Sequence, residues 1–225
     1  MSAISKHFYP EVLTSLFLKE IFGGPQMRPQ EDHARLATYT IDFNTLRPVL
    51  AFVNMESVTL DLERKVTLDD CEMLLIAQGW PRLRTLRINS WHGWPAPGSC
   101  ITFSGLAMML AILPCIEDVS LSINASIPPP HPNVGEKEDA SGSCCAPSSL
   151  KSINLLNSSK GNNAQDETTF LLHTLTNVTS CTLCARPFLW EGAGGVHVPP
   201  GTKEWWDNIF EALKTMRSGI QTAFV

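Results

Sequence analysis

The sequence predicts an α/β fold in which short parallel strands alternate with helices along an irregular solenoid. Three observations predict this fold. One apolar pattern recurs five times, its copies follow one another at similar intervals, and an amphipathic helix signal follows four of the five copies. Right-handed crossovers between parallel strands then produce a curved array in which each unit packs on its neighbours.

The recurring pattern is an apolar residue, two further residues, a second apolar residue, one further residue and a third apolar residue. The copies start at 55, 83, 116, 150 and 178, so they are separated by 28, 33, 34 and 28 residues. This spacing is close to that of leucine-rich repeats with insertions, which place strands on a concave face and helices on a convex face. The alternating apolar residues predict strands with one buried face. The copies are Met55-Val58-Leu60, Leu83-Leu86-Ile88, Ile116-Val119-Leu121, Leu150-Ile153-Leu155 and Val178-Cys181-Leu183.

Helices are expected after every copy except the third. One is expected to begin at Thr67, with Asp70 completing its cap, and the last is expected to run from Thr202 to about Gly219. The expected apolar stripes are Leu68, Cys71, Leu74 and Leu75; Leu106, Met109, Leu110 and Leu113; Phe170, Leu171, Leu172 and Leu175; and Trp206, Ile209, Phe210, Leu213 and Met216.

The sequence divides into an N-terminal segment, residues 1–35, and a repeat domain, residues 36–225. In the first segment, residues 10–22 are predicted to form an amphipathic helix, and residues 23–35 a linker. Residues 41–54 are expected to form the helical half of an earlier unit. The proline-, serine- and glycine-rich stretch at about 124–148 is predicted to be a disordered insertion, because it has too little apolar surface to order itself.

The composition argues against several classes of function. The net charge of −5 lacks the basic excess of a nucleic-acid-binding protein. No apolar stretch is long enough to cross a membrane, and the first ten residues lack a secretory signal. We therefore expect an intracellular protein, cytoplasmic or nuclear, whose seven cysteines are free thiols and which binds neither membrane nor nucleic acid.

No motif points clearly to catalysis, a metal or a cofactor. Cys181 and Cys184 form a lone CxxC pair, which is a weak metal or redox signal without further ligands. The six histidines are scattered, and no nucleophile-elbow Gly-x-Ser-x-Gly sequence occurs. We therefore expect no cofactor and no enzymatic activity, while a site assembled in space from distant residues stays an alternative.

Two stretches resemble fungal F-box/leucine-rich-repeat proteins. One is Ile41-Asp42-Phe43 through Leu46, Pro48, Leu50 and Phe52 to the strand at 55–62, and the other is Ala77-Gln78-Gly79-Trp80-Pro81-Arg82-Leu83-Arg84-Thr85-Leu86. The resemblance covers roughly residues 41–185 and concerns the repeats only, since no complete F-box is identified. It implies repeats that capture a substrate protein for a cullin-type ubiquitin ligase. The alternative is a truncated or structural fragment of an F-box/leucine-rich-repeat protein, without ligase-adaptor activity.

The residues between the apolar positions are expected to line the open face of the sheet, where a partner protein would bind. Because large anchors dominate protein interfaces, Arg87, Trp91 and Trp94 are predicted to contribute most. The alternative is a solvated face with tryptophans that pack locally. The complete predicted partner-binding set is Asp61, Thr85, Arg87, Asn89, Trp91, Trp94 and Asp118.

Overall fold

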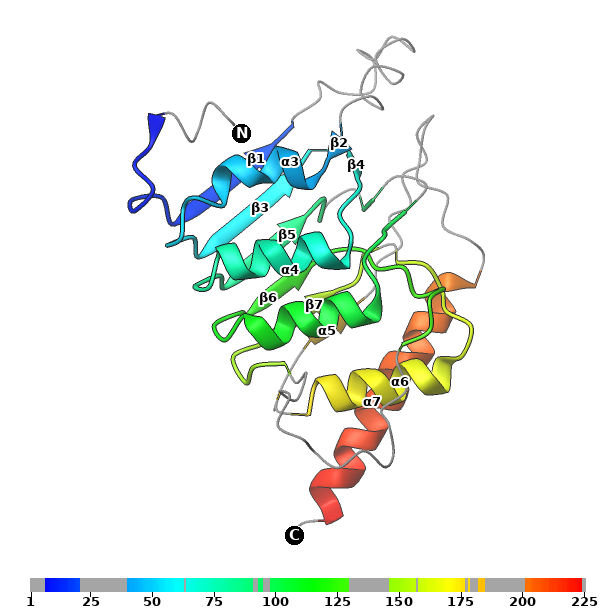
Figure 1. The fold of residues 1–225 in the computed structure, drawn as a ribbon. Helices are drawn as coiled ribbons and strands as arrows, with labels where there is room; N and C mark the ends of the chain where they lie inside the picture. Colours follow the sequence, from blue (N-terminus) through cyan, green and yellow to red (C-terminus); the bar gives the residue numbers. More distant parts are fainter. Residues whose placement is uncertain are drawn as a thin grey trace, which may run out of the picture.

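The computed structural model describes residues 7–20, 40–62, 64–90, 93–94, 98–129, 146–156, 158–176, 178, 182–184 and 201–223. Its central feature is a six-stranded, wholly parallel sheet in the order β1-β3-β5-β6-β7-β8 (Figure 1). These strands are β1 (Ser15–Lys19), β3 (Ser57–Asp61), β5 (Thr85–Ile88), β6 (Asp118–Ser120), β7 (Ser152–Asn154) and β8 (Thr182–Cys184). The predicted α/β class and parallel pairing are confirmed.

Helices follow the strands and line one face of this sheet. Figure 1 shows α3 (Phe43–Leu46), α4 (Asp70–Gly79), α5 (Phe103–Ile112) and α6 (Ala164–Thr174) one after another on the same side. A 3₁₀ turn, η1 (Arg47–Val49), extends α3, and α7 (Thr202–Ala223) packs against α6. A second, two-stranded parallel sheet joins β2 (Thr40–Ile41) to β4 (Lys65–Val66). No helix of the described residues is long and apolar enough to cross a membrane.

The apolar pattern forms the core between sheet and helices. The three apolar residues of each of the first four copies are at most 1% exposed, as predicted from their alternation. Neighbouring strands pair with the same positions opposite one another, so that Val58, Leu86, Val119 and Ile153 form one continuous row. Burying this row stabilises the parallel sheet through the hydrophobic effect.

A common turn precedes each strand. In all five copies the backbone N–H of the first apolar residue donates to the carbonyl three residues earlier, over distances of 3.0–3.3 Å. The donor and acceptor pairs are Met55 and Phe52, Leu83 and Trp80, Ile116 and Leu113, Leu150 and Pro147, and Val178 and Leu175. This repeated turn brings the chain from the helix layer back to the sheet at the same level each time.

Side-chain caps explain where the helices begin. Asp69 starts α4 through a capping box with Glu72, two residues later than the predicted start at Thr67. Thr102 caps α5, and the Asp70 carboxylate accepts from both the backbone N and the Oγ1 of Thr102 at 2.7 and 2.6 Å. The start of α4 is therefore tied to the start of α5, which fixes the spacing of these neighbouring helices.

The prediction of an N-terminal helix over residues 10–22 is wrong. Residues 15–19 form β1, which pairs in parallel with β3. The spacing of Leu13, Leu16 and Phe17 suits a helix, but Leu16 and Leu18 also alternate as a strand requires. Pairing with the edge of β3 satisfies the backbone of this segment, and such tertiary pairing overrides local propensity.

Three further predictions need correction at their boundaries. Residues 124–129 and 146–148 are ordered, with Ala125 and Ala146 buried, whereas residues 130–145 of the predicted insertion lie outside the described residues. In α4 the buried side chains are Met73, Ile76 and Ala77, while the predicted Cys71 and Leu75 are exposed, so the predicted apolar stripe lies on the wrong face of the helix. Helix α7 continues past Gly219 to Ala223, and its predicted apolar stripe is buried through Leu213.

The fifth copy of the pattern is longer than predicted. Ile153 pairs with Leu183, so Leu183 takes the second apolar position of its copy rather than the third. Val178 and Leu183 are five residues apart, whereas Leu150 and Ile153 are three apart. Two extra residues therefore separate the turn from β8.

Candidate partner-binding surface

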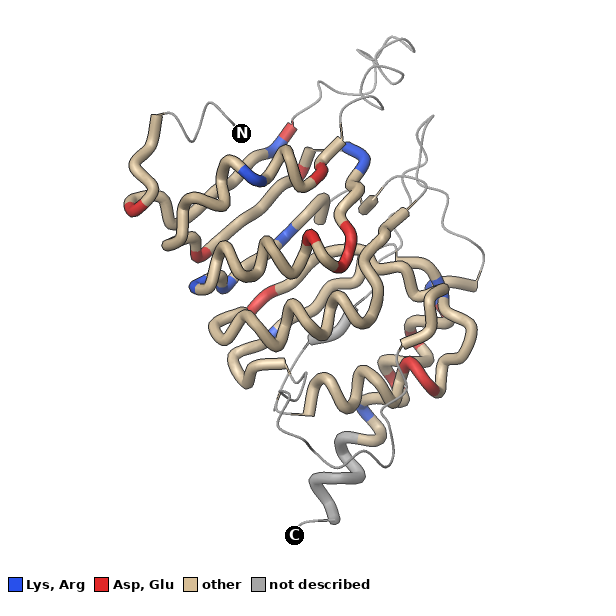
Figure 2. Tube along the Cα trace, in the orientation of Figure 1, with Lys and Arg blue, Asp and Glu red and all other residues tan. Residues whose placement is uncertain are grey.

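One row of charged residues marks the end of the sheet at which the strands begin. The residue immediately before β3, β5, β6 and β7 is Glu56, Arg84, Glu117 and Lys151 respectively, and we name these four the entry row. Figure 2 shows acidic and basic segments alternating at this end of the sheet. Backbone hydrogen bonds hold these residues in line. The carbonyls of Glu56, Arg84 and Glu117 each accept two consecutive N–H groups from the next copy, at 2.8–3.0 Å.

Three members of the entry row are joined by ion pairs. Arg84 and Lys151 donate to opposite oxygens of the Glu117 carboxylate, with Arg84 Nε 2.7 Å from Oε1. The hydrogen bond from Lys151, followed by that from Arg84, lowers the pKa of Glu117 below its ordinary value. The hydrogen bond to Glu117 in turn raises the pKa of Arg84. Glu117 and Arg84 therefore keep their charges at neutral pH.

A second ion pair lies on the sheet face opposite the helices. The guanidinium of Arg87 donates to Asp118 through Nε, 3.1 Å from Oδ1, and through Nη2, 2.9 Å from Oδ2. This two-point contact fixes the plane of the guanidinium as well as its position. The hydrogen bond to Asp118 is the main cause that raises the pKa of Arg87. The arginine side chain remains accessible, with 46% of its surface exposed.

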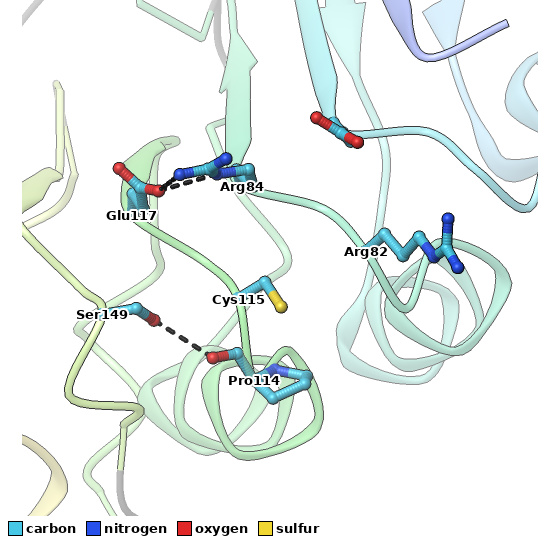
Figure 3. A pocket seen from close by; sticks show the side chains of 7 residues that line it. Arg82, Arg84, Pro114, Cys115, Glu117 and Ser149 are labelled. Carbon is cyan, nitrogen blue, oxygen red and sulfur yellow. Dashed lines mark hydrogen bonds and ion pairs between the residues drawn. The ribbon is translucent and has the colours of Figure 1, made fainter.

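A cavity of about 490 Å³ opens beside the entry row (Figure 3). Its lining comprises Glu56, Arg82, Arg84, Pro114, Cys115, Glu117 and Ser149. In Figure 3 the Arg82 guanidinium lies across the cavity from the Arg84–Glu117 pair, with the Cys115 thiol between them. Among the described residues Arg82 has no ion-pair partner, and it lines this cavity together with Glu56.

The structure brings three of the predicted partner-binding residues together on an accessible surface. Thr85 pairs with Asp118 in the sheet register, and Arg87 lies two residues along β5 from Thr85. All three side chains are partly or largely exposed. Trp91, which was predicted to contribute beside them, lies outside the described residues.

The prediction that Trp94 is a surface anchor is wrong. Its side chain is fully buried, and its Nε1 donates to the carbonyl of Ile88 at 2.9 Å. The indole therefore closes the core where β5 ends. Of the two interpretations considered for the tryptophans, local packing holds for Trp94.

Asp61 and Asn89 are also buried rather than open to a partner. Ser90 Oγ donates to the Asp61 carboxylate at 3.0 Å. The Asn89 side chain accepts from the Leu62 N–H at 3.1 Å and donates to the Arg64 carbonyl at 2.8 Å. Both side chains therefore form hydrogen bonds with polar groups where the strands end. Ser122 and Leu156, which follow the next strands at the same level, are also buried.

Sequence reasoning missed the entry row and Arg82. The signal was present, because Glu56, Arg84, Glu117 and Lys151 each directly follow the first apolar residue of their copy. Aligning the copies shows alternating charge at this position. Oppositely charged neighbours on adjacent strands are expected to pair.

The described residues contain no group of three or more histidine, cysteine or acidic side chains that could hold a metal ion. Cys181 of the CxxC pair lies outside the described residues. The exposed thiols among the described residues are Cys71, Cys100 and Cys115.

No protein-family model and no curated protein matches this chain.

Proposed function

We propose that this chain is an irregular leucine-rich-repeat solenoid that binds a partner protein and does not catalyse a reaction. The observation that carries the proposal is the register of the sheet. Equivalent positions of successive copies pair in order along parallel strands, with helices on one face and Thr85, Arg87 and Asp118 accessible on the other. Such repetition builds an extended surface suited to protein recognition.

The electrostatics of this surface suit recognition. Arg87 pairs with Asp118, and Arg84 and Lys151 pair with Glu117. These contacts raise the pKa of Arg84 and Arg87 and lower the pKa of Glu117, in each case in the direction that keeps the charge. General acid–base catalysis needs groups with pKa values near the working pH. Fixed charges of both signs, in contrast, favour one partner orientation and disfavour others.

The resemblance to F-box/leucine-rich-repeat proteins supports a narrower proposal, in which the bound partner is a substrate of a cullin-type ubiquitin ligase. The Trp80 of the resembling stretch is fully buried and donates from Nε1 to the Val49 carbonyl at 3.2 Å, so this residue has a packing role. Residues 15–19 form a strand and supply no F-box helix. The alternative within the same family is a fragment without adaptor activity.

Affinity purification followed by quantitative mass spectrometry tests the binding surface. The variant Arg87→Glu is compared with wild type and with Lys203→Glu, which disrupts an exposed ion pair on α7. We expect the same proteins to be recovered with wild type and Lys203→Glu, and to be depleted at least tenfold with Arg87→Glu. Equal recovery with all three chains would remove the proposal for this face.

A charge-swapped pair separates recognition from folding. In the double variant Arg87→Asp with Asp118→Arg the two side chains can pair again across the same strands. We expect this variant to unfold at the same temperature as wild type and still to lose the partner. Recovery of the partner by the swapped pair would show that the contact acts only through stability.

Co-purification with the adaptor subunit of a cullin-type ligase tests the narrower proposal. Association of the adaptor with this chain would support ligase membership. Partner binding without any adaptor would favour the fragment alternative and leave the binding surface intact.

A further inference from the structure

Glu167 is a buried acid for which the described residues provide no ion-pair partner. It is the fourth residue of α6, it is 1% exposed, and its Oε2 has no hydrogen-bond partner among the described residues. Burying an ionised carboxylate without a partner for each oxygen is strongly unfavourable, whereas a neutral carboxyl costs much less. Burial and the unpartnered Oε2 therefore favour the protonated form of the acid.

The carboxyl is enclosed by the loop that leads into α6. A Cβ on Gly161 would lie 1.6 Å from Glu167 Oε1 and 2.8 Å from the carbonyl oxygen of Ala125. Only a glycine fits between these groups. Backbone N–H groups of Asn162 and Asn163 donate to the Glu167 carboxyl. The side chain therefore holds residues 161–163 against the first turn of the helix.

The same loop is connected to two other parts of the molecule. Ser158 Oγ accepts from the Ile123 N–H at 2.7 Å, and Ser159 Oγ accepts from the Ala125 N–H at 2.8 Å. Trp206 of α7 donates from Nε1 to the Ser158 carbonyl at 3.3 Å. Residues 158–163, which we name the joint loop, therefore hold the 123–126 segment, α6 and α7 together.

We propose that Glu167 is a pH-operated latch that keeps the joint loop closed while neutral and opens it on ionisation. When the proton leaves, a negative charge remains in a buried site with one oxygen unpartnered. Moving the loop outward lets water solvate the carboxylate. The hydrogen bonds from 158–163 to Ile123, Ala125 and Trp206 are the contacts that this movement breaks.

The charged groups around the latch do not neutralise it. Asp166, next to it on α6, raises the Glu167 pKa further, although burial is the larger cause and the two backbone hydrogen bonds oppose it. Lys160 in the joint loop is exposed, as are Lys203 and Glu204 at the start of α7, and residues 123–126 carry no charge. The resulting pKa of Glu167 is about 7, so the latch would operate within the physiological range.

Hydrogen exchange of the joint loop across pH tests the latch. Between pH 5 and pH 8, after correction for the intrinsic exchange rate, we expect amide protection in residues 158–163 and 123–126 to fall by up to about a hundredfold. Amides of β3 and β5 report the pH dependence of global unfolding, and the loop should remain less protected than they are at every pH. Protection of the loop that does not change with pH would overturn the proposal.

Two further measurements identify the titrating group. The carboxyl ¹³C resonance of Glu167 should titrate with a midpoint near 7 in the wild-type chain, and a midpoint within one pH unit of 4.5 would overturn the proposal. The variant Glu167→Gln should show loop protection independent of pH, while the control Glu204→Gln retains the wild-type dependence. The wild-type titration alone decides the outcome if Glu167→Gln does not fold.

Discussion

Arg87 and Asp118 are diagonal neighbours on adjacent strands, and one guanidinium holds both oxygens of one carboxylate. Thr85 faces Asp118 directly, so the arginine reaches back along its own strand to make the contact. Such diagonal contacts between parallel strands are within reach of long side chains. The pair orients two charges at the centre of the accessible sheet face.

We expect the Arg87–Asp118 pair to matter little for stability. Both side chains are partly exposed, and pairs of this kind contribute below about 1 kcal/mol because water screens them. A double-mutant cycle of Arg87→Ala and Asp118→Ala, measured by urea unfolding, should give a coupling energy in that range. A coupling well above it would show that the pair is a structural element and would weaken its assignment to partner binding.

Trp94 should behave in the opposite way. Replacing this fully buried indole by alanine leaves a large cavity and an unpaired Ile88 carbonyl, which should destabilise the fold by about 3–5 kcal/mol. Trp94→Phe should be milder. At a temperature where Trp94→Phe is fully folded, partner recovery should equal that of wild type, and a selective loss of binding would restore Trp94 to the interface.

Asn89 should be sensitive for reasons of backbone geometry as well as hydrogen bonding. Its φ of 51° lies in the left-handed region, which asparagine and glycine adopt more easily than alanine. Asn89→Ala should destabilise by about 3 kcal/mol, since it strains the backbone and leaves the Leu62 N–H and Arg64 carbonyl without this partner.

The glycine variant separates the two contributions at this position. Asn89→Gly loses the same side-chain hydrogen bonds without the conformational strain, so it should be about 1 kcal/mol more stable than Asn89→Ala in thermal unfolding. Equal stability of the two variants would show that the side chain alone accounts for the loss.

The repeat pattern predicted the buried face of the sheet because the side-chain period of a strand is two. Once Leu60, Ile88 and Leu121 are assigned to the core, the opposite face follows for Thr85 and Arg87. The same rule failed for Asn89 and Asp61. There the strands end and the chain turns, so alternation no longer determines which side chain water can reach.

The tryptophans show a second limit of sequence reasoning. Trp94 follows β5 in a loop, and its burial depends on the loop folding back so that the indole N–H reaches Ile88. The alternation that identifies strands does not predict the geometry of such a loop. The entry row could have been predicted, since an alignment of the copies is enough to reveal its alternating charges.

Gly161 should tolerate no side chain. A methyl group there would overlap the Glu167 carboxyl and press on the Ala125 carbonyl, so Gly161→Ala should destabilise by roughly 2 kcal/mol or more. Shortening the acid relieves the first of these clashes. In chemical denaturation, the double variant Gly161→Ala with Glu167→Ala should therefore be more stable than the sum of the single variants predicts, and strict additivity would contradict the contact.

The stability of the whole protein should fall as pH rises from 5 to 8. The Glu167 pKa is raised to about 7 in the folded state from an ordinary value of 4.5, so in this range the folded chain holds a proton that the unfolded chain has released. The stabilising effect of the proton is complete below pH 4.5 and is lost as pH rises through 7. The difference of about 2.5 pKa units corresponds to on the order of 3 kcal/mol. Glu117 and Asp42, whose pKa values are lowered, act only at more acidic pH.

Urea unfolding at several pH values measures this effect directly. The free energy of unfolding of wild type should decline across the window, while that of Glu167→Gln should stay nearly level, because the amide cannot ionise. The two curves should therefore differ most in slope between pH 5 and pH 7. Parallel curves would mean that Glu167 has the same pKa in the folded and unfolded states. Ionisation of Glu167 would then not change the free energy of unfolding, and the latch proposal would fail.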